Sequence, residues 1–367
     1  MDTALSSPLT EWIADKIRQE GKITFWEWMH WALYHPKLGY YARTDITRWG
    51  REGDYSTSPE RSDLFAATFA RFFVSLFERM GSSAPFQIVE FGAGNGKFAL
   101  SVLNSIKNDY PSLFDLLQYT IVESNILAID SSLDTLKPFR GKVRYVGPLE
   151  FEDNQSCIVF SNELLDSFCI HRVRKVDGRL KEFYVALGED DKFEWKLGEL
   201  SDDVELFCEQ YLPELAEGQT VEVNPGIASF FDLLASKSMN GFVVTVDYGA
   251  EGKELYNQPE RFDGTLRAYS AHQFIDDVLS DPGAYDITST IDWGIAKAAS
   301  GQHGFVVEEF QQLDRFLMRV GILDELEKRM SSAANDAERA RMTTEARDMI
   351  LPGGMASSFQ VLVQKRG

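Results

Sequence analysis

The chain has 367 residues, of which 44% are hydrophobic and 13% aromatic, so it can bury a sizeable core and is not a disordered chain. Its 57 acidic and 37 basic side chains give a formal net charge of −20. This balance argues against nucleic acid and anionic membranes as partners, because both are bound through lysine and arginine. The excess of acidic residues has two interpretations: it would attract a cationic substrate, or it only keeps the protein soluble.

The cysteines and the N-terminus indicate the compartment. The three cysteines form no CxxC pair, and their odd number does not suit a disulfide framework or a zinc site. The first residues lack the features of a signal or transit peptide, and no apolar stretch approaches the roughly 18 residues that a membrane helix needs. We therefore expect a soluble, cytoplasmic protein without a bound metal.

Helical patterns dominate the first 81 residues. Apolar residues at helical spacing predict helices over 5–20 and 24–33. Ser58 and Pro59 are a typical capping residue and first-turn proline, and they open a third helix that runs to about residue 80. We expect residues 1–81 to form an N-terminal helical cap and cofactor lid.

Between residues 82 and 165, short apolar strands alternate with helices. This alternation is typical of a parallel, doubly wound α/β sheet, so these residues are assigned to the first part of a cofactor-binding sheet domain. The strands are predicted over 86–91, 118–122, 142–146 and 157–160, and the helices over 97–107 and about 127–136.

The alternation stops after Asn162, and residues 166–239 are predicted to be an inserted α+β region for substrate binding or oligomerisation. Its clearest feature is Asp177-Gly178, a strong hairpin signal between two apolar runs. The predicted strands are 169–176, 180–187 and 220–223; 207–218 is loop-like or weakly helical, and 227–237 is a helix.

Residues 240–367 return to the sheet pattern and form the remainder of the sheet domain. Two late strands separated by helices fit a parallel sheet that ends in an antiparallel edge pair. The fold class is therefore α/β, with a seven-strand, doubly wound (Rossmann-like) sheet. The expected elements are strands at 242–246, 304–310 and 359–364, a loop-rich section to about 292, and a helical segment over 313–350.

The loop Gly92-Ala93-Gly94-Asn95-Gly96 joins the first strand of the sheet to its helix. A dinucleotide site needs G-x-G-x-x-G, but Lys97 stands where its third glycine would be. Glu90, just before the loop, would repel a pyrophosphate and suits a cofactor with a free ammonium group. The pattern therefore favours S-adenosyl-L-methionine over a tight turn without a ligand.

Two later strand ends complete the predicted cofactor site. Glu123 ends the second strand, where an acidic residue can accept both ribose hydroxyls; a surface carboxylate is the alternative. Leu149, after the third strand, is positioned to give backbone contacts to the adenine.

The turn after the fourth strand carries the candidate catalytic residues Asn162, Glu163 and Asp166. The two acids are three residues apart, so both can lie on one helical face above the methyl group. If the methyl acceptor is a guanidinium, the two carboxylates would hold it by hydrogen bonds and receive its proton. A capped turn with exposed acids is the alternative, and nearby His171 is either a base or, more simply, structural.

With these motifs, the chain resembles the MidA family of class I methyltransferases, which includes a mitochondrial complex I assembly factor that methylates a protein arginine. The resemblance implies that Asp54, Thr57, Ser58 and Glu60 close over the cofactor, and that the turn at 162–166 faces the acceptor. The matching segments are 32–42, 53–60, the glycine loop, 162–166, 246–249, 264–267 and 281–288.

Three positions depart from the family pattern. Ala93 replaces a usual proline, which should leave cofactor binding intact, whereas Ser167-Phe168-Cys169 and Thr290 change the acceptor side. A protein arginine nitrogen is therefore the first expectation for the acceptor. A small-molecule O- or N-methyltransferase and a non-catalytic assembly factor remain as alternatives, and the sequence allows a homodimer.

Overall fold

The computed structural model describes residues 7–44, 63–81, 86–150, 156–237, 239–270, 273–351 and 353–367. The expected helix start at Ser58 and Pro59 lies outside these ranges, as do the other three residues of the predicted lid, Asp54, Thr57 and Glu60. The long helix itself is α4, described over Asp63–Met80.

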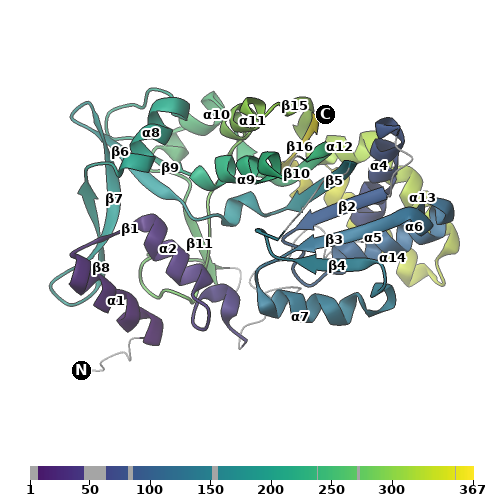
Figure 1. Ribbon diagram of the computed structural model, residues 1–367, viewed down its shortest axis with the longest axis horizontal. Coiled ribbons are helices and arrows are strands. Elements are labelled where there is room, and N and C mark those ends of the chain that lie inside the picture. The colour runs from purple at the N-terminus through teal and green to yellow at the C-terminus, as the bar shows by residue number, and fades with distance from the viewer. Residues whose placement is uncertain are drawn as a thin grey trace.

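A central sheet of seven strands runs in the order β15–β16–β10–β5–β2–β3–β4 (Figure 1). The five strands from β10 to β4 are parallel, and β16 is antiparallel to both of its neighbours. This order confirms the expected seven-strand fold. The strands are β2 (Phe86–Phe91), β3 (Leu117–Val122), β4 (Val143–Val146), β5 (Ser156–Asn162), β10 (Asn240–Ala250), β15 (Val306–Gln312) and β16 (Phe359–Arg366), with the short β14 (Ile291–Asp292) beside the end of β10.

Side chains alternate between the two faces of this sheet, and each face is covered by helices (Figure 1). Ile88 of β2 packs in a core with α4, α5, α12 and α14, whereas the next residue, Val89, packs in a second core with α8, α9 and α11. The helices are α5 (Lys97–Asp109), α6 (Pro111–Leu116), α7 (Ile126–Thr135), α8 (Asp202–Tyr211), α9 (Pro225–Ser236), α10 (Lys253–Tyr256), α11 (Trp293–Gln302), α12 (Leu313–Val320), α13 (Ile322–Ser332) and α14 (Asp336–Ile350).

A second, antiparallel sheet joins the N-terminal segment to the inserted region. The strand β1 (Ile23–Thr24) pairs with β7 (Arg179–Leu187), which pairs with β6 (His171–Val176) and β8 (Phe193–Gly198); β9 (Thr220–Val223) pairs with β6. The helices α1 (Pro8–Glu20) and α2 (Phe25–Tyr34) share a third hydrophobic core with residues of this sheet. The N-terminal segment and the inserted region therefore lie together at one end of the molecule (Figure 1).

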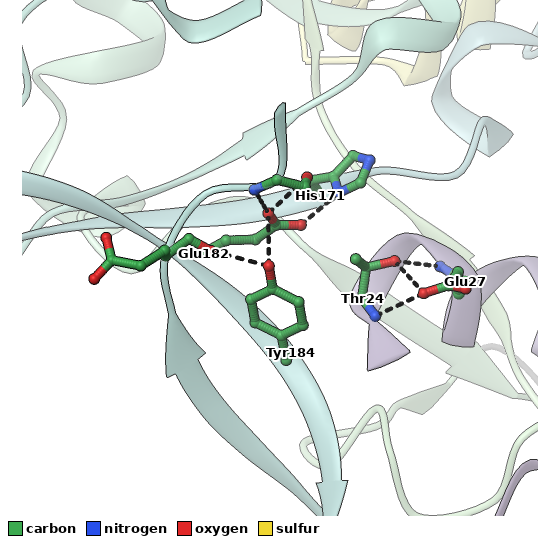
Figure 2. Close-up of polar contacts among 7 residues, drawn as sticks. Thr24, Glu27, His171, Glu182 and Tyr184 are labelled. Carbon is green, nitrogen blue, oxygen red and sulfur yellow. Dashed lines mark hydrogen bonds and ion pairs between the residues drawn. The ribbon is translucent and has the colours of Figure 1, made fainter. Parts of the chain in front are cut away.

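Residues close together in the sequence determine two features of this region, a helix cap and the predicted hairpin turn. Thr24 caps α2: its hydroxyl accepts from the Glu27 amide at 3.1 Å, and the Glu27 carboxylate accepts from the Thr24 amide at 2.9 Å (Figure 2). Asp177 and Gly178 have φ values of 51° and 75°, as a two-residue hairpin turn between β6 and β7 requires. The segment predicted as loop-like or weakly helical is helical as far as Tyr211.

A third, three-stranded sheet occupies part of the section for which the sequence predicts mostly loops. It runs in the order β12–β11–β13, with β11 (Arg267–Ser270), β12 (Gln273–Phe274) and β13 (Asp286–Thr288). The helical segment before β16 is three helices, because Gly321 ends α12 at a φ of 107° and Asn335 caps α14. Among the described residues, no helix is long and apolar enough to cross a membrane.

Candidate active site

A cavity of about 1290 Å³ lies at the carboxyl ends of β2, β3 and β5, where ligands bind in open α/β sheets. Its wall on the sheet side is formed by the glycine loop, the end of β3, the start of α7 and the turn after β5. The opposing wall comes from α2, the short helix Tyr40–Ala42 and the three-stranded sheet. Most of the predicted cofactor residues that the structure describes therefore line one cavity with the predicted catalytic turn; they are Glu90, Gly92, Ala93, Gly94 and Glu123.

The glycine loop needs its glycines at both ends. Gly92 and Gly96 have φ values of 71° and 76°, in the left-handed region that favours glycine. A Cβ atom at position 96 would lie 2.9 Å from the Cβ of Ser132 in α7, and one at position 92 would lie 3.0 Å from the Leu164 side chain. The loop is thus packed closely between α7 and the catalytic turn, and its backbone faces the cavity.

Glu90 lines the cavity although only 4% of the residue is exposed. The hydroxyl of Tyr119 donates to its Oε2 at 2.7 Å. Burial raises the pKa of Glu90 to about 7, and the hydrogen bond from Tyr119 only partly opposes this rise. A buried carboxylate of this kind gains free energy when a cation binds beside it, which fits the ammonium group of the predicted cofactor.

Glu123 also lines the cavity, at the end of β3. The amides of Ser124 and Asn125 both donate to its Oε1 at 2.8 Å, which fixes the orientation of the side chain. Burial nevertheless raises its pKa. Leu149 does not belong to the described lining: the residue is 85% exposed and its carbonyl accepts from Lys237 Nζ at 3.0 Å, whereas Pro148 lines the cavity.

The predicted catalytic turn is held by a carboxylate that was not identified from the sequence as a site residue. Asp247, at the end of β10, is fully buried, and its Oδ2 accepts from the amides of Leu165 at 2.9 Å and Asp166 at 3.3 Å. Its Oδ1 accepts from the Tyr248 amide at 2.9 Å. Glu163 begins the turn with a φ of 51°, which is unusual for a residue with a long side chain. The turn is therefore a fixed shape rather than a surface loop.

The acids of the turn are close enough to perturb one another. Asn162 Nδ2 donates to Glu163 Oε1 at 3.0 Å, and the Tyr248 hydroxyl lies 3.5 Å from its Oε2. Burial, followed by the charge of Asp247, raises the pKa of Glu163 to about 8. Burial and the same charge raise the pKa of Asp166, which is 5% exposed. Both acids line the cavity, so the reading of an exposed, capped turn is wrong.

Two charged residues of the three-stranded sheet line the same cavity and were not identified from the sequence as site residues. They are Arg267 of β11 and Asp286 of β13. Both lie in segments that match the family, yet no local pattern shows that a small sheet brings them to the turn. The aromatic residues that line this part of the cavity were also not identified from the sequence. They are Trp26, Tyr34, Tyr41, Phe168, Phe230, Tyr248 and Tyr269.

His171 has a structural environment rather than that of a base. Its Nδ1 lies 2.7 Å from Oε1 of Glu182, which is fully buried and also accepts from the Ser201 amide at 2.8 Å (Figure 2). The His171 ring stacks on Trp26, with 6.4 Å between the centroids. Trp26 lines the cavity, whereas His171 is absent from the described lining. His171 therefore packs against the side of Trp26 that faces away from the cavity.

Comparisons with known proteins identify the family of the chain. A model of the Methyltransf_28 family, described as S-adenosyl-L-methionine-dependent methyltransferases, matches residues 68–311, well over half of the chain. The chain is 25% identical over 377 residues to "Protein arginine methyltransferase NDUFAF7 homolog, mitochondrial" of Caenorhabditis elegans, covering 96% of this chain and 85% of that protein. It is 27% identical over 349 residues to "Protein arginine methyltransferase NDUFAF7, mitochondrial" of Xenopus tropicalis, covering 88% and 77%.

A solved structure shares the fold over almost the whole chain. It is a COG1565 superfamily member from Burkholderia thailandensis bound to S-adenosyl-homocysteine, with a TM-score of 0.85 and 24% identity over 98% of this chain and 92% of that one. The extent of the family match confirms the resemblance drawn from the glycine loop and the catalytic turn. The chain belongs to this family of methyltransferases, and S-adenosyl-L-methionine is its cofactor.

Proposed function

We propose that the protein transfers a methyl group to a nitrogen of a protein arginine. The proposal rests on the charged side chains at the end of the cavity beside the turn after β5, which we call the acceptor end. Glu163, Asp166 and Asp286 line it, and among the described residues of that end the only cation is Arg267. Burying several carboxylates with one cation is costly, and a positively charged acceptor would offset that cost.

A guanidinium suits this end better than other cations. It stays charged at any physiological pH, and its planar set of five N–H donors can meet carboxylates on more than one edge. The Caenorhabditis and Xenopus relatives carry the name of protein arginine methyltransferases, which supports the same acceptor.

The chain's residues divide the work as follows in this proposal. Glu90, the glycine loop and Glu123 hold the cofactor, which supplies a methyl group on a positively charged sulfur. Asn162, Glu163 and Asp166 hold the acceptor so that one nitrogen lies in line with that methyl group. As the nitrogen–carbon bond forms and the sulfur–carbon bond breaks, the nitrogen becomes more acidic and its proton passes to Glu163. The bound cation also lowers the pKa of Glu163, which keeps its carboxylate ready to accept that proton.

A small-molecule acceptor is the second candidate, and the aromatic lining favours it. Trp26, Tyr34, Phe168 and Phe230 offer flat apolar surface on which a ring-shaped substrate would stack. The cavity exceeds the roughly 300–1,000 Å³ typical of a single small ligand, so the cofactor and either kind of acceptor would fit together.

The wider organisation is also part of the proposal. We assign residues 1–81 to a cap and lid, 82–165 with 240–367 to the sheet domain, and 166–239 to an inserted region for the acceptor or a second copy of the chain. The pairing of β1 with β7 supports a cap and insert that act as one wall. The cysteines are buried and odd in number, which supports the cytoplasm as its compartment.

Methyl transfer in a cell extract tests the acceptor. The purified chain would be incubated with S-adenosylmethionine labelled in the methyl group, and the labelled proteins would then be hydrolysed to amino acids. We expect the label in methylated arginine. Label confined to the small-molecule fraction would establish the second candidate instead, and label in a different amino acid would refute the arginine assignment.

A further inference from the structure

We propose that Asp286 is a third acceptor-binding carboxylate, which the three-stranded sheet brings to the catalytic turn from outside the methyltransferase sheet. The inference rests on the proposed function, because it assigns a residue to the binding of the guanidinium. It adds a contact that neither the glycine loop nor the turn after β5 contains. The acceptor would then be held by two separate parts of the chain.

Backbone pairing fixes the position of Asp286 relative to the turn. In the antiparallel pair of β11 and β13, Asp286 lies opposite Tyr269, and Thr288 lies opposite Arg267. Just beyond β13, the amide of Ser289 donates to the carbonyl of Asp166 at 3.3 Å. The end of β13 therefore lies against the turn that carries Glu163 and Asp166, and Asp286, at the start of the same short strand, lines the same cavity.

The charge of Asp286 acts on both of those acids. It raises the pKa of Glu163, after burial and the charge of Asp247, and it raises the pKa of Asp166 as well. Arg267 opposes the rise at Asp166. Asp286 itself is 8% exposed and lines the cavity. Three carboxylates thus share one space, and a guanidinium between them would make charge-assisted hydrogen bonds on more than one edge.

Tyr41 is the positioning residue for Asp286 in this arrangement. Its hydroxyl donates to Asp286 Oδ1 at 3.1 Å, and its carbonyl accepts from Asn125 Nδ2 at 2.8 Å. Asn125 caps α7, and its amide donates to Glu123 Oε1 at 2.8 Å. A run of hydrogen bonds therefore leads from the predicted ribose carboxylate, through the N-terminal cap, to the proposed acceptor carboxylate.

The test replaces Asp286 with asparagine, which keeps its size and removes its charge. Asp276→Asn is the matched control, because Asp276 is an exposed carboxylate of the same segment, outside the described lining. Calorimetry with S-adenosyl-homocysteine would report the cofactor site, and methyl transfer from labelled S-adenosylmethionine to extract proteins would report the reaction. We expect D286N to lose transfer by about 30-fold or more with cofactor affinity unchanged, and D276N to behave as the wild type.

The pH profile separates this role from a merely structural one. Glu163 is faced by Asp247 and Tyr248 of β10, by Asn162 and by Asp286, and its charge also acts on the neighbouring Asp166. Removing the charge of Asp286 lowers the pKa of Glu163, so the acidic limb of the rate profile should move to lower pH. Tyr41→Phe retains the carboxylate and removes only its hydroxyl partner; we expect about a tenfold rise in the acceptor KM.

Two outcomes would overturn the assignment of Asp286. One is wild-type transfer by D286N, and the other is a loss of transfer with no movement of the acidic limb. Failure of the arginine proposal gives a different result, since the wild type would then place its label in something other than methylarginine.

Discussion

Replacing Asp247 with asparagine tests whether a buried carboxylate holds the catalytic turn. The two oxygens of Asp247 accept three backbone amides, from Leu165, Asp166 and Tyr248, at 2.9, 3.3 and 2.9 Å. Asparagine keeps one acceptor oxygen and presents an NH₂ group on the other side. The oxygen is expected to face the amides of Leu165 and Asp166. The NH₂ group of asparagine then faces the N–H group of Tyr248, so that two donors meet without an acceptor.

The expected loss follows from these contacts. Hydrogen bonds to a charged group contribute about 1.5–3 kcal/mol each and neutral ones about 1 kcal/mol, so one strong bond is lost and two are weakened. The substitution also removes a buried charge that repels Glu163, which returns part of that loss. We expect the free energy of unfolding to fall by about 2–3 kcal/mol.

Urea unfolding of the ligand-free protein at about pH 8.5 measures this loss, because burial raises the pKa of Asp247 to about 7 and the group is charged there. Asp263→Asn is the control; its side chain is 82% exposed, so its unfolding free energy should change by less than about 0.5 kcal/mol. Equal stabilities of D247N and the wild type would refute the reasoning.

Three further predictions follow from the same site. Glu163→Gln should keep the affinity for S-adenosyl-homocysteine and lower turnover by about 2–4 kcal/mol of transition-state stabilisation; full activity would remove Glu163 from the mechanism. Gly96→Ala should weaken the binding of S-adenosyl-homocysteine in calorimetry and lower the unfolding free energy by about 1–3 kcal/mol. The reasons are that the φ of Gly96 is 76° and that the new Cβ would lie 2.9 Å from Ser132. Unchanged affinity would contradict the claim that the loop has no room for a side chain at this position. Finally, the pKa values of Glu90 and Glu163 are raised to about 7 and 8 from 4.5, so these groups favour the folded state when protonated. Their contribution is complete below about pH 4.5 and is lost as pH rises to about 8, so the melting temperature of the ligand-free protein should fall across that range, and by less in E163Q.

Features with a local physical cause could be predicted from the sequence. The glycine loop needs positive φ values next to a strand, and the hairpin needs them at Asp177 and Gly178; only a few residue types adopt them. The alternation of short apolar strands with helices likewise specified the central sheet. The break between α12 and α13 has an equally local cause in Gly321, yet continuous helical periodicity on both sides concealed it.

The rest of the site depends on contacts between distant segments. Asp286 and Arg267 reach the cavity through short strands whose pairing has no strong local signal, and Asp247 acts on a turn far from it in the chain. The same holds for β1, two residues long, which is a strand only because β7 pairs with it. Spacing could identify Glu163 and Asp166 as candidates, but not the carboxylates and the arginine that surround them.

Mass spectrometry of extract proteins after incubation with S-adenosylmethionine that carries a trideuterated methyl group tests the central claim most directly. Wild-type chain should place the heavy methyl group on arginine side chains, and Glu163→Gln, at equal occupancy by the cofactor, should leave them almost unmodified. A heavy methyl group found only on other residues or on small molecules, or equal arginine labelling by both proteins, would contradict the account.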